Sequence, residues 1–294
     1  MLQGVIPALM TPFGANGTQV DLVALRKLCD HLIASKVAGL FVTGTTGEFV
    51  SLNPDERRLV IREAIKYVNG RIPVLIHVGS FNTAETVALT KYAKELGADG
   101  IGAMPPYFYR LDEEALFAHF ARVAEAAAGM PMFLYNIPGA ALNEISLANV
   151  ARLKKAFPHI RGIKDSSGDM ERERKMVEMN MPDFIVINGC DEETLTALKH
   201  GVRATVSSTA NVFPEAFTAV YEPFLAGDMK KAQAAQDRLF KLTQILDHGR
   251  TLGAYKQALA WKGVDIGPVR PPLRELTDNE RAELRAELEK AQWI

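Results

Sequence analysis

The sequence has little cysteine: Cys29 and Cys190 are the two among 294 residues, and they lie far apart in the chain. A disulfide framework needs more than this, so we expect a reducing, cytoplasmic location. The six histidines show no close pairing with cysteines or carboxylates at the spacing of metal ligands. We therefore expect no structural metal site.

Long apolar runs and an excess of charge of one sign are also lacking. No stretch is long enough to cross a bilayer, and the first residues, MLQGVIPALMTPF, lack the basic start and cleavage site of a secretory signal. The formal net charge is -1, which creates no overall field that attracts nucleic acid. These absences predict a protein that binds neither membranes nor nucleic acids.

What the sequence has is a repeated alternation of short apolar runs with longer amphipathic segments. Most of the runs are continuously apolar, which is typical of parallel strands buried on both faces. The eight predicted strands span residues 4–10, 39–44, 73–79, 99–104, 130–136, 160–164, 184–189 and 203–208.

Helix start and stop signals lie between these strands. Asp21 precedes one amphipathic segment, Asn53 precedes Pro54 at the start of another, and Gly97 follows a third. Eight such units predict an α/β fold, a (β/α)₈ TIM barrel. The alternative, a doubly wound sheet, has fewer strands and a glycine-rich fingerprint after the first strand, which this sequence lacks.

From about Pro214 onward the pattern is helical only. The first of these segments closes the barrel, and three further helices form a C-terminal helical appendix, with a proline-rich connector over residues 264–276 before the last. We therefore predict a barrel over residues 1–225 and a three-helix extension over residues 226–294.

Polar residues follow several predicted strands, at the end of a barrel where active sites lie. They are GTTGE at 44–48, PPYFYR at 105–110, Tyr135 with Asn136, Lys164, GCDEE at 189–193 and SSTAN at 207–211.

Lys164 is the candidate nucleophile, because an amine desolvated among apolar side chains forms a Schiff base with a carbonyl substrate more readily. The protonated imine is an electron sink for making or breaking the adjacent bond. Tyr135 can move the protons that this chemistry needs. The hydroxyls and backbone amides around Thr45 and Thr46 suit a small carboxylate.

Each of these residues has a structural alternative. A lysine or a tyrosine at a strand end is often simply solvated. Glu48 can serve the following helix N-terminus, and Asp191 can cap a helix whose first turn is acidic. Cys190 is expected to be an unreactive small side chain.

Taken together, GTTGE, YNIP and GIKDSSGD, in this order and spacing, resemble the dihydrodipicolinate synthase / N-acetylneuraminate lyase family of class I aldolases. The resemblance covers essentially the whole chain, the C-terminal helices included. It implies that Lys164 forms a Schiff base with pyruvate or another 2-oxo acid and that Tyr135 relays protons. It also implies that Thr45 and Thr46 bind the carboxylate and join the relay, with Thr46 counted among the catalytic residues. It further implies that no cofactor is needed and that the protein is a homotetramer, a dimer of dimers.

Two departures concern the synthase of this family. Ala140 stands where the synthase has an arginine that binds the carboxylate of aspartate semialdehyde, and Phe108 stands where it has a tyrosine that reaches a neighbouring subunit. Tyr107, Tyr109 or Arg110 remain open as substitutes. By contrast, GCDEE and SSTAN are similar to the sialic acid lyases, which implies that polyol hydroxyls are bound by Gly189, Asp191, Glu192 and Ser208.

The leading hypothesis is thus a pyruvate-dependent lyase acting on a carbon–carbon or carbon–oxygen bond, whose partners are a 2-oxo acid and an aldehyde. Its substrate is expected to be a 2-keto-3-deoxy sugar acid, a sialic-acid-like compound or another hydroxy-oxo acid. The alternative enzyme is dihydrodipicolinate synthase with a remodelled triad. The alternative of another class is a barrel that binds a 2-oxo acid without catalysis.

Overall fold

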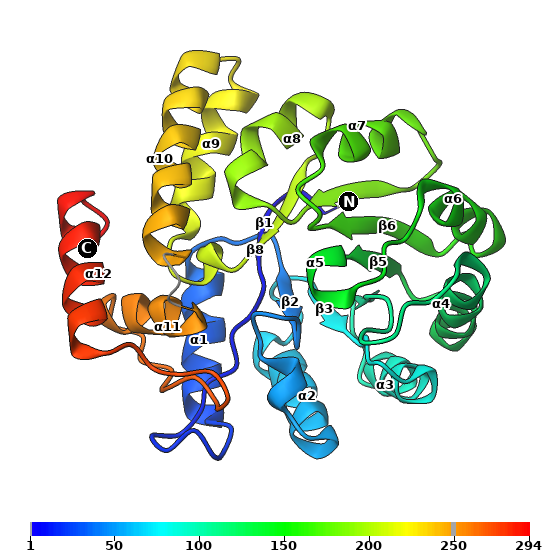
Figure 1. The fold of residues 1–294 in the computed structure, drawn as a ribbon, viewed down its shortest axis with the longest axis horizontal. Coiled ribbons are helices and arrows are strands. Elements are labelled where there is room, and N and C mark those ends of the chain that lie inside the picture. Colours follow the sequence, from blue (N-terminus) through cyan, green and yellow to red (C-terminus); the bar gives the residue numbers. More distant parts are fainter. Residues whose placement is uncertain (1, 248–250) are drawn as a thin grey trace.

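The computed structural model describes residues 2–247 and 251–294. Within them, eight parallel strands pair in chain order, and a bridge between Ala8 and Phe41 joins the first to the second and closes the barrel (Figure 1). The strands are β1 (Gly4–Pro7), β2 (Leu40–Val42), β3 (Val74–His77), β4 (Gly100–Ala103), β5 (Met132–Asn136), β6 (Ile160–Asp165), β7 (Ile185–Asn188) and β8 (Ala204–Ser207). The predicted TIM barrel is confirmed, and β6 runs one residue beyond the predicted end at Lys164.

Helices follow the strands and surround the barrel (Figure 1). Asp21 caps α1 through hydrogen bonds to two backbone amides, and Asn53 forms a capping box with Glu56 at the start of α2. The helices of the barrel are α1 (Leu22–Ala34), α2 (Pro54–Val68), α3 (Thr83–Glu95), α4 (Glu113–Ala127), α5 (Pro138–Ala141), α6 (Leu147–Ala156), α7 (Met170–Glu178), α8 (Thr194–His200) and α9 (Pro214–Leu225).

The inside of the barrel is filled by side chains. Phe41 from β2 lies against Gly102 of β4, where an added Cβ would come within 2.6 Å of the Phe41 ring. Glycine at this position therefore makes room for the aromatic ring. Since the interior is packed, a substrate can bind only above it, at one end of the strands.

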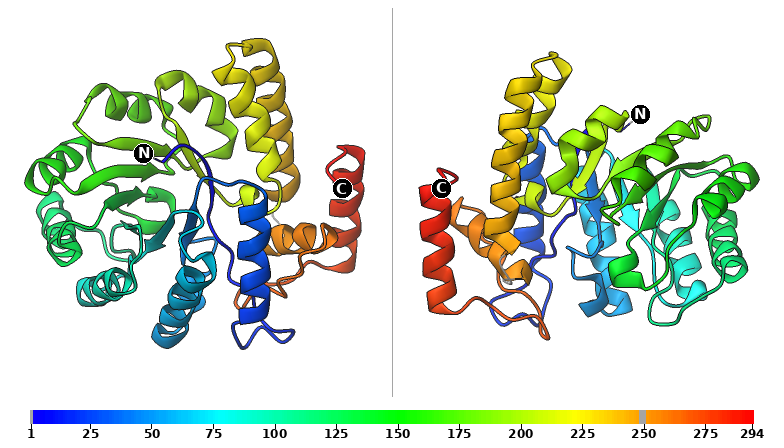
Figure 2. Two further views of the ribbon diagram at one scale, coloured as in Figure 1. Left: turned by 180° about the vertical axis from the view of Figure 1, so that it is seen from behind. Right: turned by 45° about the horizontal axis from the view of Figure 1, so that its top comes forward.

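Three more helices follow α9: α10 (Met229–Asp247), α11 (Thr251–Trp261) and α12 (Asp278–Lys290). Helix α10 packs on α9, α12 packs on α10 and α11, and α11 reaches the turn after β8 (Figure 2). The division of the chain at residue 225 stays a prediction. No helix in the described part of the chain is long and apolar enough to cross a membrane.

Candidate active site

A cavity of about 580 Å³ lies at the carboxyl ends of the strands. All eight residues predicted for the site line it. They are Thr45, Thr46, Tyr135, Lys164, Gly189, Asp191, Glu192 and Ser208. The barrel therefore brings together side chains that are spread over five βα units of the sequence.

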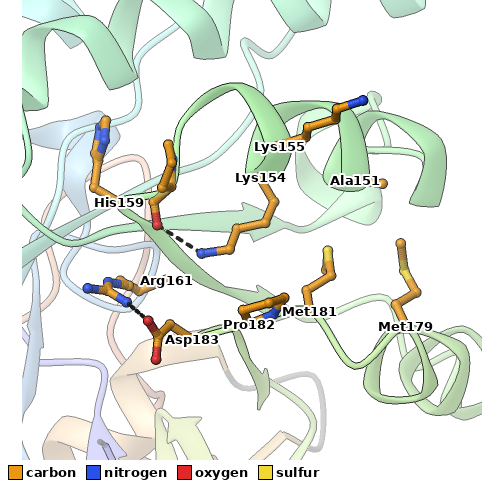
Figure 3. A pocket seen from close by; sticks show the side chains of 10 residues that line it. Ala151, Lys154, Lys155, His159, Arg161, Met179, Met181, Pro182 and Asp183 are labelled. Carbon is orange, nitrogen blue, oxygen red and sulfur yellow. Dashed lines mark hydrogen bonds and ion pairs between the residues drawn. The ribbon is translucent and has the colours of Figure 1, made fainter.

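A larger hollow of about 920 Å³ lies elsewhere, beside the first residues of β6 (Figure 3). There Arg161 forms an ion pair with Asp183 at 2.8 Å, and Lys154 donates to the backbone oxygen of Pro158. None of the predicted site residues lines this hollow. Size alone thus does not identify the active site, whereas the clustering of reactive side chains does.

Lys164 and Tyr135 lie side by side at the bottom of the site cavity. They are paired in register on β6 and β5, and their exposed fractions are 7% and 2%. The Lys164 Nζ lies 4.0 Å from the centre of the Tyr135 ring and 5.2 Å from that of Phe41. None of the described carboxylates forms an ion pair with Lys164. Its amine is therefore held by aromatic rings and left free for a carbonyl substrate.

The strand ends that carry this pair are tied together one residue further on. Asn136 Nδ2 donates to Asp165 Oδ2 at 3.0 Å, and Arg172 Nε donates to the same oxygen at 2.9 Å. The other carboxylate oxygen accepts from the backbone amide and hydroxyl of Ser167, at 2.8 and 2.5 Å. A buried carboxylate with this many donors is fully compensated, so Asp165 is suited to holding β5 and β6 in place.

The two threonines stand on a tight turn after β2. The Glu48 backbone amide donates to the carbonyl of Thr45 at 3.0 Å, and a Cβ on Gly47 would come within 2.9 Å of the Leu9 carbonyl oxygen, so the turn needs glycine there. Thr45 Oγ1 lies 3.4 Å from the Tyr135 hydroxyl. The Thr46 and Ser208 hydroxyls are 2.6 Å apart. The turn thus places hydroxyls beside the tyrosine and at the cavity wall.

Asp191 follows β7 and lines the cavity. Its Oδ2 accepts from the Ser207 hydroxyl at 2.7 Å, and burial raises the pKa of its carboxyl to about 7. It makes no capping bond to α8, so the alternative of a helix cap is wrong for this residue. Gly189 is required nearby, because a Cβ there would lie 2.8 Å from the backbone oxygen of Asp165.

The two positions that depart from the synthase lie outside this cavity. Ala140 is exposed on the short helix α5. Tyr107 packs edge-on against Phe49 and Phe81, whereas Phe108 is 75% exposed and adopts a positive φ of 85°. Tyr109 and Arg110 are exposed as well. None of these loop residues lines the cavity, although Tyr107 packs against the same hydrophobic cluster as Phe41 and Tyr135.

Sequence reasoning missed the contribution of the C-terminal helices to the site. Thr243, Asp247, Leu252 and Tyr255 line the cavity, and the Tyr255 hydroxyl donates to Asp247. It also missed Lys256, which forms an ion pair with Glu48 at 2.8 Å. A signal was present, since Lys256 is the one charged residue in the apolar stretch GAYKQALAW. Glu48 therefore serves this pair and does not cap the helix that follows it.

Metal binding has no obvious place in the part of the chain that the structure describes. No three histidine, cysteine, aspartate or glutamate side chains gather there in a way that could hold a metal ion. Burial raises the pKa of the Cys190 thiol at the cavity wall to about 11, which keeps it in the poorly reactive protonated form.

Comparison with known proteins shows a similarity that extends beyond the three motifs to nearly the whole chain. The model of the dihydrodipicolinate synthetase family matches residues 1–291. A 4-hydroxy-tetrahydrodipicolinate synthase of Methanopyrus kandleri is 36% identical over 289 residues, covering 98% of this chain and 96% of that protein. An uncharacterised DapA-like lyase of Halobacterium salinarum is 36% identical over 291 residues, covering 98% and 93%.

Solved structures of the same family have the same fold. YagE, a prophage protein of the dihydrodipicolinic acid synthase family from E. coli K12, was solved in complex with pyruvate and superposes with a TM-score of 0.94 at 31% identity, covering both chains completely. The resemblance inferred from the three motifs is confirmed: the chain belongs to the dihydrodipicolinate synthetase family and is a lyase of the pyruvate-dependent, class I aldolase type.

Proposed function

We propose that this lyase forms a Schiff base between Lys164 and pyruvate and uses it to cleave or build a hydroxylated 2-oxo acid. The observation that supports this most directly is the Lys164 amine, buried against the Tyr135 ring and without a carboxylate partner among the described residues. A buried lysine that only stabilised the fold would need a paired anion. A 2-oxo acid instead reacts with the amine to form the Schiff base, and its carboxylate supplies the negative partner that Lys164 lacks among the described residues.

The chemistry follows from the positions of the side chains. The Lys164 amine attacks the C2 carbonyl, and loss of water leaves a protonated imine. In the cleavage direction the C3–C4 bond breaks, its electron pair moves into the imine to give an enamine, and the C4 hydroxyl loses its proton as the aldehyde forms. The enamine is then protonated at C3, and water releases pyruvate. Tyr135 and Thr45, whose hydroxyls are 3.4 Å apart, carry these protons.

The threonine turn takes the carboxylate of the 2-oxo acid in this proposal. Its backbone amides and the Thr45 and Thr46 hydroxyls stand beside Tyr135 and Ser208. Hydrogen bonds from a backbone nest and hydroxyls are sufficient for one small carboxylate. Thr46, which is buried, extends the relay towards Ser208.

The rest of the cavity favours a hydroxylated aldehyde as the second partner. Lys164 is the one cation among the described lining residues, and Asp191, Glu192 and Asp247 form an acidic wall of the cavity. The oxygens of these carboxyl groups accept hydrogen bonds from hydroxyls, and those groups that are ionised repel a second carboxylate. A 2-keto-3-deoxy sugar acid, a sialic-acid-like compound or a related hydroxy-oxo acid fits this wall, with Gly189 and Ser208 completing it.

A second candidate is 4-hydroxy-tetrahydrodipicolinate synthesis, which the name of the Methanopyrus relative favours. Against it stand Ala140, which offers no cation, and Phe108, which offers no hydroxyl. A homotetramer remains part of the proposal, and in such an assembly Tyr107, Tyr109 or Arg110 of a neighbouring chain would be the groups to restore these functions.

The experiment that tests the proposal is reduction with borohydride in the presence of pyruvate, followed by intact mass and peptide mapping. We expect one adduct, on Lys164, and none in Lys164→Met. The matched control is Lys155→Met, which removes an exposed lysine beside the other hollow and should leave the adduct unchanged. An adduct on another lysine, or none, rejects the mechanism and leaves the non-catalytic barrel as the better description.

A further inference from the structure

The Glu48–Lys256 pair is a buried ionic contact between the threonine turn and the C-terminal helices. The two side chains are 0% and 2% exposed, and Glu48 Oε1 lies 2.8 Å from Lys256 Nζ. Burial lowers the pKa of Lys256 even though Glu48 acts in the opposite direction. Such a pair is expensive to desolvate and seldom adds stability, so its presence calls for another explanation.

The surroundings of Lys256 show a fully satisfied ammonium. Besides Glu48, its Nζ donates to the carbonyl oxygens of Thr11 at 2.9 Å and Pro268 at 2.8 Å. Thr11 in turn donates its hydroxyl to the Gly47 carbonyl at 2.6 Å. The amine thus holds three separate segments at fixed distances, one of which is the threonine turn.

Glu48 is connected to the reactive end of the turn through the backbone. Its amide donates to the Thr45 carbonyl, and its own backbone is in the left-handed region, with a φ of 54°. A residue other than glycine holds this conformation only where its surroundings impose it. Glu48 Oε2 also accepts from the backbone amide of Arg270 at 2.8 Å. Both carboxylate oxygens are therefore held by the C-terminal part of the chain.

Arg270 strengthens the same connection from the far side of the turn. Its guanidinium binds Glu56 with two contacts of 2.7 and 2.8 Å and donates to the Ser51 carbonyl at 2.9 Å. The segment from Glu48 to Glu56 is thus fastened at both ends to residues of α11 and of the connector before α12. This is more attachment than a helix start needs, since Asn53 already caps α2.

We propose that Lys256 is a positioning residue: through Glu48 it sets the orientation of Thr45 and Thr46 towards Tyr135, so that the C-terminal helices determine how the 2-oxo acid carboxylate is bound. This inference rests on the proposed function of the threonine turn. It gives the C-terminal helices a role in catalysis beyond lining the cavity.

The test compares three variants of the full chain: Lys256→Met, the double variant Glu48→Gln/Lys256→Met, and Lys262→Met. Lys262 is the matched control, because it follows the same helix and forms an ion pair with Glu215 at 2.5 Å, away from the turn. The readouts are the pyruvate concentration that half-saturates borohydride trapping, and the rate of hydrogen exchange at the pyruvate methyl group.

In Lys256→Met we expect half-saturation to rise roughly 10- to 100-fold, the change that loss of a charged hydrogen bond produces. At saturating pyruvate, borohydride should still trap the adduct, because Lys164 itself is unchanged. Hydrogen exchange at the pyruvate methyl group should be slower, because Thr45 is no longer correctly placed beside Tyr135. Lys262→Met should behave as wild type.

The double variant distinguishes two explanations: Lys256 positions the threonine turn, or Lys256 only neutralises the charge of Glu48. It can be measured even if Lys256→Met fails to fold. It removes both charges, so no buried ion is left unpaired, and we expect it to fold while keeping the raised half-saturation. Recovery to wild-type trapping and exchange would show that Lys256 only neutralises Glu48, and the inference would be wrong. If the wild type itself forms no adduct with pyruvate, both the proposed function and this inference are wrong. If the wild type forms the adduct and the Lys256 variants show the same half-saturation and exchange rate as the wild type, only this inference is wrong.

Discussion

Asn136 and Asp165 are joined by a hydrogen bond of 3.0 Å one residue beyond the Tyr135–Lys164 pair, at the ends of β5 and β6. Asp165 also receives the Arg172 guanidinium at 2.9 Å, and both side chains are buried. The proposed nucleophile and proton relay thus stand directly below a crosslink of polar groups. This arrangement restricts the strand ends so that the amine and the phenol ring keep their contact.

Asp165→Asn is expected to destabilise the protein by about 3–5 kcal/mol, because it removes the buried anion that Arg172 contacts at 2.9 Å and leaves only the half-exposed Glu144 carboxylate, 3.7 Å away. Denaturant unfolding measures the effect. The control is Asp183→Asn, which breaks the exposed pair with Arg161 on the same strand and should cost less than about 1 kcal/mol. Equal losses in the two variants would contradict a special role for the crosslink.

Tyr135→Phe is expected to lower turnover by roughly 10²–10⁴-fold, the usual effect of losing an acid–base group. The ring that contacts Lys164 is retained, so the adduct with pyruvate should still form. Tyr92→Phe, on α3 and away from the cavity, is the control and should turn over normally. Near wild-type turnover in Tyr135→Phe, with the best aldehyde available, would remove Tyr135 from the relay.

Activity is expected to survive exhaustive chelation, because a protonated imine supplies the electron sink that a metal would otherwise provide. The measurement is turnover before and after dialysis against a chelator, with metal added back. Loss of activity that a divalent metal restores would point to a different mechanism.

Stability should depend on the ionisation of Asp191. Its carboxyl pKa is raised from 3.8 to about 7 in the folded protein, so between these values the folded state holds a proton that the unfolded state has released. The free energy of unfolding therefore falls as pH rises from about 4 to about 7.

Asp191→Asn removes this contribution while its amide oxygen can still accept from Ser207. Unfolding at several pH values between 4 and 8 should show the variant gaining stability over wild type as pH rises. Asp237→Asn, at an exposed position on α10, serves as the control. A difference between wild type and Asp191→Asn that is constant across this range would contradict the raised pKa.

Hydroxylated aldehydes are expected to be better partners for pyruvate than aspartate semialdehyde. The second carboxylate of aspartate semialdehyde meets no described cation, and leaving it unpaired costs several kcal/mol, or orders of magnitude in kcat/KM. The measurement is kcat/KM for a set of C3–C6 hydroxyaldehydes against aspartate semialdehyde, in wild type and in Glu192→Gln.

If aspartate semialdehyde is clearly preferred, the synthase is the right member of the family and the lyase proposal is wrong. If hydroxyaldehydes are preferred but Glu192→Gln has no effect, the substrate class stands and the assignment of Glu192 to the polyol does not.

Much of this protein could be predicted from local patterns. Continuous apolar runs separated by helix caps such as Asp21 and Asn53 led to the barrel, because a strand that is buried on both faces is apolar at nearly every position, which the local sequence shows. Strand ends then led to the site, since parallel strands carry their carboxyl ends to one edge. In this way the sequence by itself determined that Lys164, Tyr135, Thr45 and Thr46 share one cavity.

Only the tertiary structure decided how these residues are held. Glu48 pairs with Lys256 from the C-terminal helices, and Asp191 accepts from Ser207 at the end of the next strand. No periodicity records such contacts, because the first depends on where α11 packs against the closed barrel and the second on how the ends of β7 and β8 meet. Glu48 and Asp191 both stand where a helix start is expected, so the sequence left capping open as an alternative for each. A carboxylate binds whichever donor the folded chain brings to it, and in this fold the donors are Lys256 of α11 and Ser207 of the neighbouring strand.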